Sequence, residues 1–338
     1  MDDTPDSASI ECLPEYVRNG EADRIRERLE HCRDAPVDRR KDAIGAIRSV
    51  VDERAGAMAP IVPALATFLT DDDRSVRLRT AKLFVALARV EPDAVVDVVD
   101  ALASRLADDE EFYYVRARSA EALGYVALER PEEVTMPAIL ADLRIGLSFD
   151  EPEVREKLAK ALSHVALGDP DRLRHLVPDL ADHLESDDEL VRYHLCTAVV
   201  AVGCERPDAL TDAVDDLSAR LEDDSEYVRG RGAEALGLVA RSDIAGPELP
   251  RERLASLADG DDVESFTRKR ARFALAGLEG DSAEAGDESE LGSLSAIREH
   301  TNEIVEEITA PDGDGCPHCG LTLPGNGPTI CPRCGGPY

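Results

Sequence analysis

The chain has 338 residues, 71 acidic and 39 basic, which gives a formal net charge of −32. This balance counts against nonspecific nucleic-acid binding, because neutralising phosphates requires a basic surface. No apolar run approaches the ~18 residues that a membrane-spanning helix needs. No hydrophobic signal-peptide core follows Met1 either. We therefore expect a cytoplasmic protein that does not bind membranes.

Lysine is rare in this chain. Only five of the basic residues are lysine, namely Lys41, Lys82, Lys157, Lys160 and Lys269. An acidic, lysine-poor composition resembles that of proteins from the cytoplasm of extreme halophiles. The Debye length falls from ~8 Å at physiological ionic strength to ~3 Å at molar salt, which screens the self-repulsion of an acidic surface. The composition therefore predicts a halophilic protein whose acidity reflects the solvent more than the partner.

A short motif recurs through most of the chain, after an acidic N-terminal segment at 1–13. The motif consists of an apolar residue, an arginine, any three residues and then a small residue. It occurs at Val76-Arg77, Val115-Arg116, Val154-Arg155, Val191-Arg192 and Val228-Arg229. Successive copies are 39, 39, 37 and 37 residues apart. Weaker copies stand at Arg39 and at Phe266-Thr267. Such self-similarity, with almost no strand-like alternation, predicts an all-α helical solenoid of about seven two-helix repeats over 14–279.

Each repeat divides into two helices joined by an acidic turn. The first helix often begins at proline, which loses no hydrogen bond at a helix start, and we expect such helices at 60–69, 92–106, 170–184 and 207–221. A carboxylate from an acidic turn such as Asp71-Asp72-Asp73 or Asp187-Asp188-Glu189 can cap the second helix and meet the positive end of its dipole. Small residues such as Ala120 and Gly124 on the second helix should let neighbouring helices approach closely.

The acidic turns and recurring arginines resemble the HEAT repeat, in particular the subclass named after the phycobilin lyases, over about four-fifths of the chain. The resemblance implies a fold rather than an activity, because no short catalytic motif of the lyases can be found in this sequence. Another HEAT-type family, the deoxyhypusine hydroxylases, binds a di-iron centre through repeated His-Glu pairs. No His in this chain is followed by Glu. We therefore expect a protein that is not an enzyme.

The recurring arginines have two possible roles. In the first, each pairs with a turn carboxylate, and together they form a structural ladder that sets the stacking angle between repeats. In the second, they form a basic stripe that lines the concave surface and binds an anionic partner. We favour the ladder over the stripe. The residues concerned are Arg77, Arg116, Arg155, Arg192 and Arg229.

Two further groups of residues have the types that bind metals. His175, Asp179 and His183 are four residues apart and would share one face of a helix. Apolar residues already define the buried face of that helix, so we expect the two histidines to face solvent. The second group is equally weak and consists of His194, Cys196 and Cys204. We expect no metal at either group.

Residues 280–312 form an acidic linker that contains one short amphipathic helix. The part at 280–290 is nearly devoid of apolar residues, and we expect it to be disordered. Apolar positions with spacings of three and four then predict a helix over 291–309, with a seam of Leu294, Ile297, Thr301, Ile304 and Ile308. Since isolated helices this short are marginal in water, we expect this one to dock on its own chain. A weak dimer and an external partner are the alternatives.

Residues 313–338 carry two Cys-Pro-x-Cys-Gly pairs, whose cysteines are Cys316, Cys319, Cys331 and Cys334. In each pair, Pro fixes one dihedral and Gly permits a positive φ, so the four thiolates can form the tetrahedral site that zinc accepts. No position is left for water, so the predicted zinc is structural. The pattern resembles the small zinc-ribbon modules appended to many archaeal and bacterial proteins. Iron in a rubredoxin-like centre and two disulfides are the alternatives.

Taken together, these features predict a non-enzymatic scaffold that acts by protein–protein interaction and carries a tethered zinc ribbon. A nucleic-acid-associated or regulatory factor, which would use the repeat arginines and the ribbon together, is one alternative. An enzyme accessory or lyase-like protein of the phycobilin-lyase HEAT type is another. We expect the partner to be a protein, and a nucleic-acid partner is less favoured.

Overall fold

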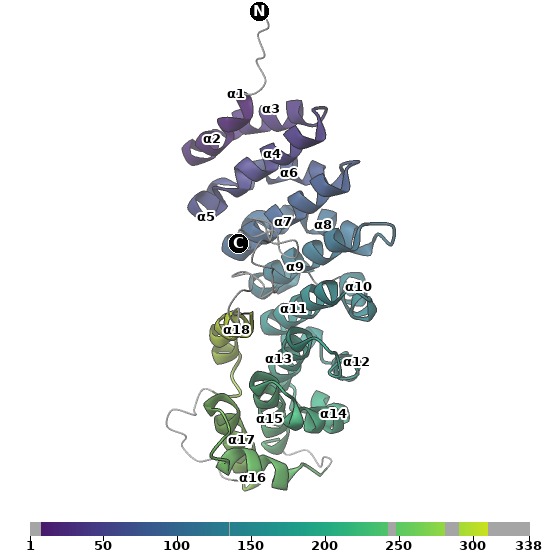
Figure 1. Cartoon of the computed structure of the whole chain (residues 1–338), viewed down its shortest axis with the longest axis vertical. Coiled ribbons are helices and arrows are strands. Elements are labelled where there is room, and N and C mark those ends of the chain that lie inside the picture. Colours follow the sequence, from purple (N-terminus) through teal and green to yellow (C-terminus); the bar gives the residue numbers. More distant parts are fainter. Residues whose placement is uncertain (1–7, 135, 243–247, 281–290, 310–338) are drawn as a thin grey trace, which may run out of the picture. The chain divides into compact units, whose positions relative to one another are not determined.

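The computed structural model in Figure 1 describes residues 8–134, 136–242, 248–280 and 291–309. Every regular element in these ranges is a helix, either α or 3-10. The prediction of an all-α fold is therefore confirmed for this part of the chain. The chain divides into two compact units, Met1–Arg172 and Leu173–Tyr338, and each is described separately below.

The first unit is a stack of helical hairpins. Its α-helices are α1 (Ala8–Glu11), α2 (Leu13–Asn19), α3 (Ala22–Cys32), α4 (Val37–Arg48), α5 (Val51–Arg54), α6 (Val62–Ala66), α7 (Arg74–Val90), α8 (Val99–Ala107), α9 (Tyr113–Glu129), α10 (Pro137–Ile145) and α11 (Pro152–Gly168). Its 3-10 segments are η1 (Ala55–Ala57), η2 (Ala59–Ile61), η3 (Thr67–Thr70), η4 (Pro92–Val98), η5 (Pro131–Val134), η6 (Gly146–Ser148) and η7 (Pro170–Arg172). The second helices of successive repeats, α4, α7, α9 and α11, pack against one another in chain order.

Small residues determine how closely these second helices approach. A Cβ atom added to Gly124 in α9 would lie 2.7 Å from the Cα atom of Ala161 in α11. Atoms cannot remain that close, so any larger residue at position 124 would push the two helices apart. Ala120, one turn before Gly124, is also fully buried. The sequence correctly predicts close helix approach at these small residues.

The second unit continues the same pattern and adds one helix. Its elements are α12 (Val177–Ala181), α13 (Glu189–Glu205), η8 (Pro207–Ala213), α14 (Val214–Ala219), η9 (Arg220–Glu222), α15 (Glu226–Ala240), α16 (Arg251–Asp259), α17 (Ser265–Leu278) and α18 (Leu294–Thr309). Helix α13 packs on α15, and α15 packs on α17, which α16 also contacts. Helix α18 packs on α13, on the side away from α12 (Figure 1). It therefore covers the face that the second helices of this unit form.

Carboxylates of the acidic turns cap two of the second helices, α7 and α13, as the sequence predicts, whereas α9 and α11 have no side-chain cap and Ser225 caps α15. The Asp73 carboxylate accepts hydrogen bonds from the backbone N–H groups of Ser75 and Val76 at the start of α7. Asp188 accepts from the N–H groups of Leu190 and Val191 at the start of α13 in the same way. Each cap satisfies N–H groups that have no partner within the helix.

The first helices are less regular than the sequence predicts. Over 170–184, where we expect one continuous helix, only α12 (Val177–Ala181) is α-helical, and η7 and turns occupy much of the rest. Pro178 has no N–H, so it cannot donate the hydrogen bond that would join α12 to the preceding turn. Over 92–106 and 207–221, a 3-10 segment precedes the α-helix, and a further one, η9, follows α14. The prediction of single uninterrupted first helices was therefore wrong.

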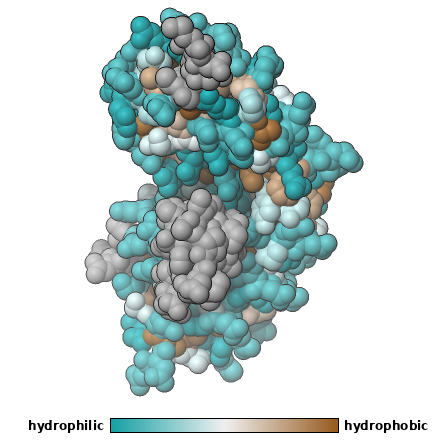
Figure 2. Space-filling model, turned by 45° about the horizontal axis from the view of Figure 1, so that its top comes forward, coloured by the Kyte–Doolittle hydropathy of each residue, from teal (hydrophilic) through white to brown (hydrophobic). Residues whose placement is uncertain are grey.

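The surface is strongly hydrophilic in the view of Figure 2, where brown hydrophobic residues form only small patches among the described residues. The large apolar side chains that are exposed in the described ranges are Val90 at the end of α7, Met136 just before α10 and Ile145 at the end of α10. Within these ranges, no helix has the length and apolar character needed to span a membrane.

Candidate functional site

Helix α18 is the described element that the repeat pattern does not account for. Its side chains Ile297, Thr301 and Ile304 are only 2%, 3% and 5% exposed. These residues belong to the seam that the sequence predicts, while Leu294 and Ile308 at the two ends are half-buried. Since α18 packs on α13 of the same unit, the seam residues are buried against their own chain. The expectation of docking within the chain is thus met for this helix.

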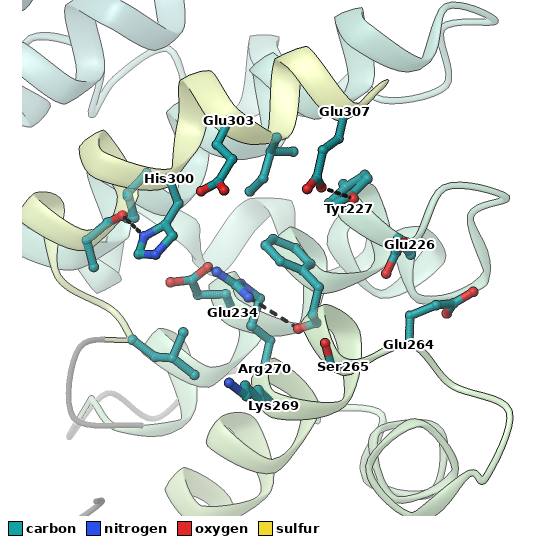
Figure 3. A pocket seen from close by; sticks show the side chains of 15 residues that line it. Glu226, Tyr227, Glu234, Glu264, Ser265, Lys269, Arg270, His300, Glu303 and Glu307 are labelled. Carbon is teal, nitrogen blue, oxygen red and sulfur yellow. Dashed lines mark hydrogen bonds and ion pairs between the residues drawn. The ribbon is translucent and has the colours of Figure 1, made fainter. Parts of the chain in front are cut away.

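A pocket of about 580 Å³ remains between α15, α17 and α18 (Figure 3). Tyr227 and Glu234 of α15, and Phe266 and Arg270 of α17, line one side of it. On the other side, Glu303 and Glu307 project from α18 towards them. The hydroxyl group of Tyr227 donates a hydrogen bond to the Glu307 carboxylate, which links α18 to α15 near the C-terminal end of α18.

Charged side chains of α15 and α17 form a buried network beside this pocket. Arg231 Nη1 lies 2.8 Å from Glu234 Oε2, and Arg270 Nε lies 2.8 Å from the same oxygen atom. The Arg231 and Glu234 side chains are 0% and 1% exposed. The other carboxylate oxygen of Glu234 accepts a hydrogen bond of 3.1 Å from the backbone N–H of Gly292, just before α18. One buried carboxylate therefore holds two repeats and the α18 segment together.

Aromatic rings complete the network. The Arg270 guanidinium carbon lies 3.5 Å from the centroid of the Phe266 ring. Arg231 Nη2 donates to the hydroxyl oxygen of Tyr193 over 3.4 Å. Cation–π contacts of desolvated arginines contribute about 2 kcal/mol. The rings thus help to offset the loss of water around two buried cations.

The protonation of this network follows from its geometry. Burial alone would raise the pKa of Glu234, but Arg270, Arg231 and the Gly292 N–H together hold that pKa below its usual value. Burial lowers the pKa of Arg270, and the nearby cation Arg231 lowers it further, while Glu234 compensates only in part. Glu234 is therefore an ionised carboxylate at neutral pH. Its removal would leave two buried cations without their counter-charge.

Three of the recurring arginines bridge adjacent turns with similar contacts. Arg192 Nε lies 2.8 Å from Asp223 Oδ2 of the next turn, and its Nη1 donates to the Ser186 carbonyl of its own turn over 2.8 Å. Arg77 pairs with Glu111 at 2.7 Å, and Arg229 pairs with Glu264 at 2.8 Å. Both also donate to turn carbonyls, those of Asp71 and Asp223 respectively.

In the terminal repeats, arginines one residue after the aligned positions donate to carbonyls of their own turns, and only Arg40 also bridges to a carboxylate of the next turn. Arg40 pairs with Asp71 at 2.9 Å and donates to the Ala35 carbonyl. Arg268 donates to the Val263 carbonyl over 2.6 Å. These contacts are therefore made at positions 40 and 268, next to Arg39 and Thr267, which the sequence pattern aligns with Arg192.

Arg116 and Arg155 depart from this arrangement. Arg116 is buried, donates to the Leu106 carbonyl over 2.9 Å and stacks on Phe149, with its guanidinium carbon 4.8 Å from the ring centroid. Its ion pair with Asp109 spans 3.3 Å and uses a carboxylate that is 91% exposed. The Nε atom of Arg155 is buried and has no hydrogen-bond partner in the described part of the chain. The five arginines therefore do not share one environment.

No group of three or more potential ligands that could hold a metal occurs within the described ranges. Arg174 Nε lies 2.9 Å from His175 Nε2, and the helix that would align His175 with His183 does not extend over either residue. Burial raises the pKa of both Cys196 and Cys204 to about 12, so neither is a reactive thiolate at neutral pH. The four predicted zinc ligands, Cys316, Cys319, Cys331 and Cys334, lie outside the described residues, and their role stays a prediction.

Sequence reasoning missed the buried network because charged residues in a helix are usually exposed. A signal was nonetheless present. The spacing Arg-x-x-Glu occurs at Arg118 and Glu121 in α9 and again at Arg231 and Glu234 in α15, in equivalent positions of two repeats. On a helix, residues three apart are neighbours. A charged pair that recurs at one repeat position could have indicated a shared inward-facing site.

No protein-family model matches the chain, and no curated protein matches it. Several solved structures that resemble it are designed or engineered proteins. One designed armadillo repeat protein is 20% identical, with a TM-score of 0.54 over 64% of this chain and 99% of that chain. A designed armadillo repeat protein in complex with peptide (KR)4 is 19% identical, with a TM-score of 0.54 over 64% of this chain and 99% of its own. An engineered protein covers 90% of this chain and 85% of that chain, at 20% identity and a TM-score of 0.54.

These likenesses concern the fold alone. Together with the successive helical hairpins in each unit, they identify the fold as an armadillo- or HEAT-type helical repeat solenoid. Such proteins stack short helical units whose apolar faces are covered only by their neighbours. The predicted fold class is therefore confirmed.

Proposed function

We propose that the protein is a non-enzymatic scaffold that binds a segment of a partner protein on the face formed by α13, α15 and α17. One observation carries this proposal. Helix α18 follows the repeats in sequence, yet it lies on this face and buries Ile297, Thr301 and Ile304 there. A surface that accepts one amphipathic helix by apolar seam contacts can accept another, which is the helix-in-groove mode of recognition.

Two further points support segment binding. The designed armadillo repeat protein described above was solved with the peptide (KR)4, so a related fold can present a peptide-binding surface. In addition, Arg77, Arg192 and Arg229 are engaged by carboxylates. This supports a structural ladder at these residues and counts against a free basic stripe for nucleic acid.

The accessory or lyase-like alternative would draw on the pocket beside α18, which has room for a small ligand. The buried charged groups among its lining residues, however, are Glu234 and Arg270, and they are ion-paired with each other. A catalytic or ligand-orienting site requires groups that remain available to the ligand. We therefore favour segment binding over a small-molecule activity.

A peptide with the sequence of residues 294–309 tests the proposal. In the full-length double variant Ile297→Asp and Ile304→Asp, the chain's own α18 should no longer dock, because two carboxylates would enter an apolar contact. We expect the labelled peptide to bind this variant and to bind wild type at least about tenfold more weakly, since wild type is already occupied. Fluorescence anisotropy measures both. If the peptide does not bind the variant while circular dichroism shows intact helices, the proposal fails.

We also infer that residues 313–338 form the tethered zinc ribbon of this scaffold. Four thiolates in two Cys-Pro-x-Cys-Gly pairs are the donor set of a closed structural zinc site. Metal analysis of the purified protein should give one zinc per chain, and Cys316→Ser or Cys334→Ser should lose it without changing the helical circular dichroism signal. Unchanged metal content in both variants would rule out this assignment.

The acidic composition supports the proposal that this protein works in concentrated salt, in the cytoplasm of a halophile. Unscreened carboxylates repel one another over a Debye length of ~8 Å at physiological ionic strength and ~3 Å at molar salt. The helical signal should therefore fall on dialysis from molar to about 0.1 M KCl, because repulsion then reaches farther. A signal that stays constant across the salt series would contradict this inference.

A further inference from the structure

Helix α18 does not fill the surface on which it lies. The pocket of about 580 Å³ that remains between α15, α17 and α18 is much larger than a water molecule. This pocket is partly open to solvent, and exposed side chains of α18 such as Glu303 and Glu307 line it. Helix α18 therefore covers this face only in part.

The charges at one end of α18 also fit the surface poorly. Its residue Glu307 contacts Tyr227 and lines the pocket together with Glu226 and Glu264. Burial raises the pKa of Glu226, and Glu264 and Glu307 raise it further, while Arg229 opposes them. Arg229 itself already pairs with Glu264 at 2.8 Å. Docking of α18 thus brings a third carboxylate to a wall that has two carboxylates and one nearby arginine.

The helix dipole adds to this mismatch. Glu306 and Glu307 lie in the last turn of α18, which contains no basic residue. The C-terminal end of a helix has partial negative charge and is stabilised by cations rather than anions. A carboxylate at position 307 therefore gains the hydrogen bond from Tyr227 but is unfavourable for the helix dipole and for the neighbouring carboxylates Glu226 and Glu264.

We propose that α18 is a weak internal substitute for the partner, and that the partner segment is an amphipathic helix with a basic residue where α18 has Glu307. This inference rests on the proposed function and narrows the class of partner. A lysine or arginine at that position would pair with Glu226 and complement the dipole of its own helix. A partner of this kind displaces α18, and occupation of the face by α18 keeps weaker or less basic segments out.

Variant peptides of residues 294–309 test this inference on the full-length double variant Ile297→Asp and Ile304→Asp. The Glu307→Lys peptide should bind roughly tenfold more tightly than the unaltered peptide at moderate salt, because a repulsive contact becomes an attractive one. Glu307→Gln keeps an acceptor for Tyr227 and should lie between the two. The matched control is Glu306→Lys, which makes the same charge change in the same turn at an exposed residue that does not line the pocket.

The outcomes separate the inference from the function on which it rests. If none of the peptides binds, the proposed function fails. If the peptides bind but Glu307→Lys is no tighter than Glu306→Lys, segment binding stands and the basic-partner inference is overturned. The advantage of Glu307→Lys should also shrink as KCl rises, because both partners of the new ion pair are near solvent. An advantage that is independent of salt would also contradict the inference.

Discussion

Two buried charge networks, one in each unit, occupy equivalent positions in the repeat but are completed differently. In the first unit, Arg118 Nη1 and Lys160 Nζ lie 2.6 and 3.1 Å from the two oxygens of Glu121, and Lys160 also donates to the hydroxyl oxygen of Tyr125 over 2.8 Å. The Lys160 contacts join α11 to α9, whereas the pair of Arg118 with Glu121 lies within α9. In the second unit, the equivalent carboxylate, Glu234, binds two arginines and also the Gly292 N–H.

The difference shows how one repeat position can acquire a new partner. In α9 and α11, the cations Arg118 and Lys160 are each 13% exposed. In α15, by contrast, Arg231 is completely buried. A buried ion pair is stable only when further hydrogen bonds satisfy its remaining atoms. The Gly292 N–H supplies such a bond, so in the second unit the network also anchors the segment that leads into α18.

The largest effect should come from removing the central carboxylates. Glu234→Gln keeps the side-chain volume but leaves Arg231 and Arg270 without a counter-charge, and it should lower the free energy of unfolding by about 3–5 kcal/mol. The matched change Glu121→Gln should have a smaller effect, about 2–3 kcal/mol, because Arg118 and Lys160 can turn towards water. Chemical denaturation of the two variants measures this. A larger loss for Glu121→Gln would reverse the comparison.

The bridging arginines should show effects of intermediate size that follow their contacts. Arg192→Ala leaves Asp223 partly unpaired and should lower the free energy of unfolding by about 1–3 kcal/mol. Arg116→Ala loses a carbonyl hydrogen bond and the Phe149 contact, so about 1–2 kcal/mol is expected. Arg155→Ala should have the smallest effect, within about 0.5 kcal/mol of wild type, because it removes a half-buried side chain whose buried Nε atom has no partner in the described ranges. Thermal melts in high salt rank the three variants, and equal losses would indicate a uniform ladder instead.

The smallest effect should appear in the acid dependence of stability. Burial alone would raise the pKa of Glu121, but Lys160, Lys157 and Arg118 hold it well below the usual 4.5. The pKa of Glu234 is also lowered. Because the unfolded chain binds these protons at higher pH than the folded chain, each carboxylate stabilises the fold above pH 4.5, and this contribution is lost as pH falls below 4.5.

Both Gln variants should therefore lose less stability than wild type as the pH falls from about 5 to 3. We expect the stronger effect for Glu121→Gln, since the pKa of Glu121 is the one held well below its usual value. Unfolding measured at several pH values in constant salt tests this. An acid dependence that neither substitution reduces would show that other carboxylates determine it.

The repeat architecture could be predicted from sequence because its signals are local. The Val-Arg pairs, the small residues and the capping Asp73 and Asp188 all lie within or just before one helix, and each acts through short-range geometry. The partners of the arginines could not be assigned in this way. The interval from arginine to carboxylate is 34 residues for Arg77 and 31 for Arg192, because turn lengths differ between repeats.

The seam of α18 could likewise be predicted from sequence, since Ile297, Thr301 and Ile304 follow helical spacing. Its docking surface could not, because the contact of Gly292 with Glu234 joins residues 58 positions apart and depends on tertiary packing. The buried Arg231 was unpredictable for a related reason. Its environment comes from Tyr193 and Glu234 on two different helices, and no local pattern marks a charged residue as fully buried.

The turn at Asp223 has a consequence for how the second unit unfolds. Its carboxylate accepts from Arg192 of the preceding repeat, and its backbone carbonyl accepts from Arg229 of its own repeat. Melting either repeat would break contacts of the other, so this turn couples the two repeats energetically. In a linear array, such nearest-neighbour coupling decides how many repeats melt together. Loss of Asp223 should thus broaden the unfolding transition as well as lower its midpoint, because neighbouring repeats would then open more independently.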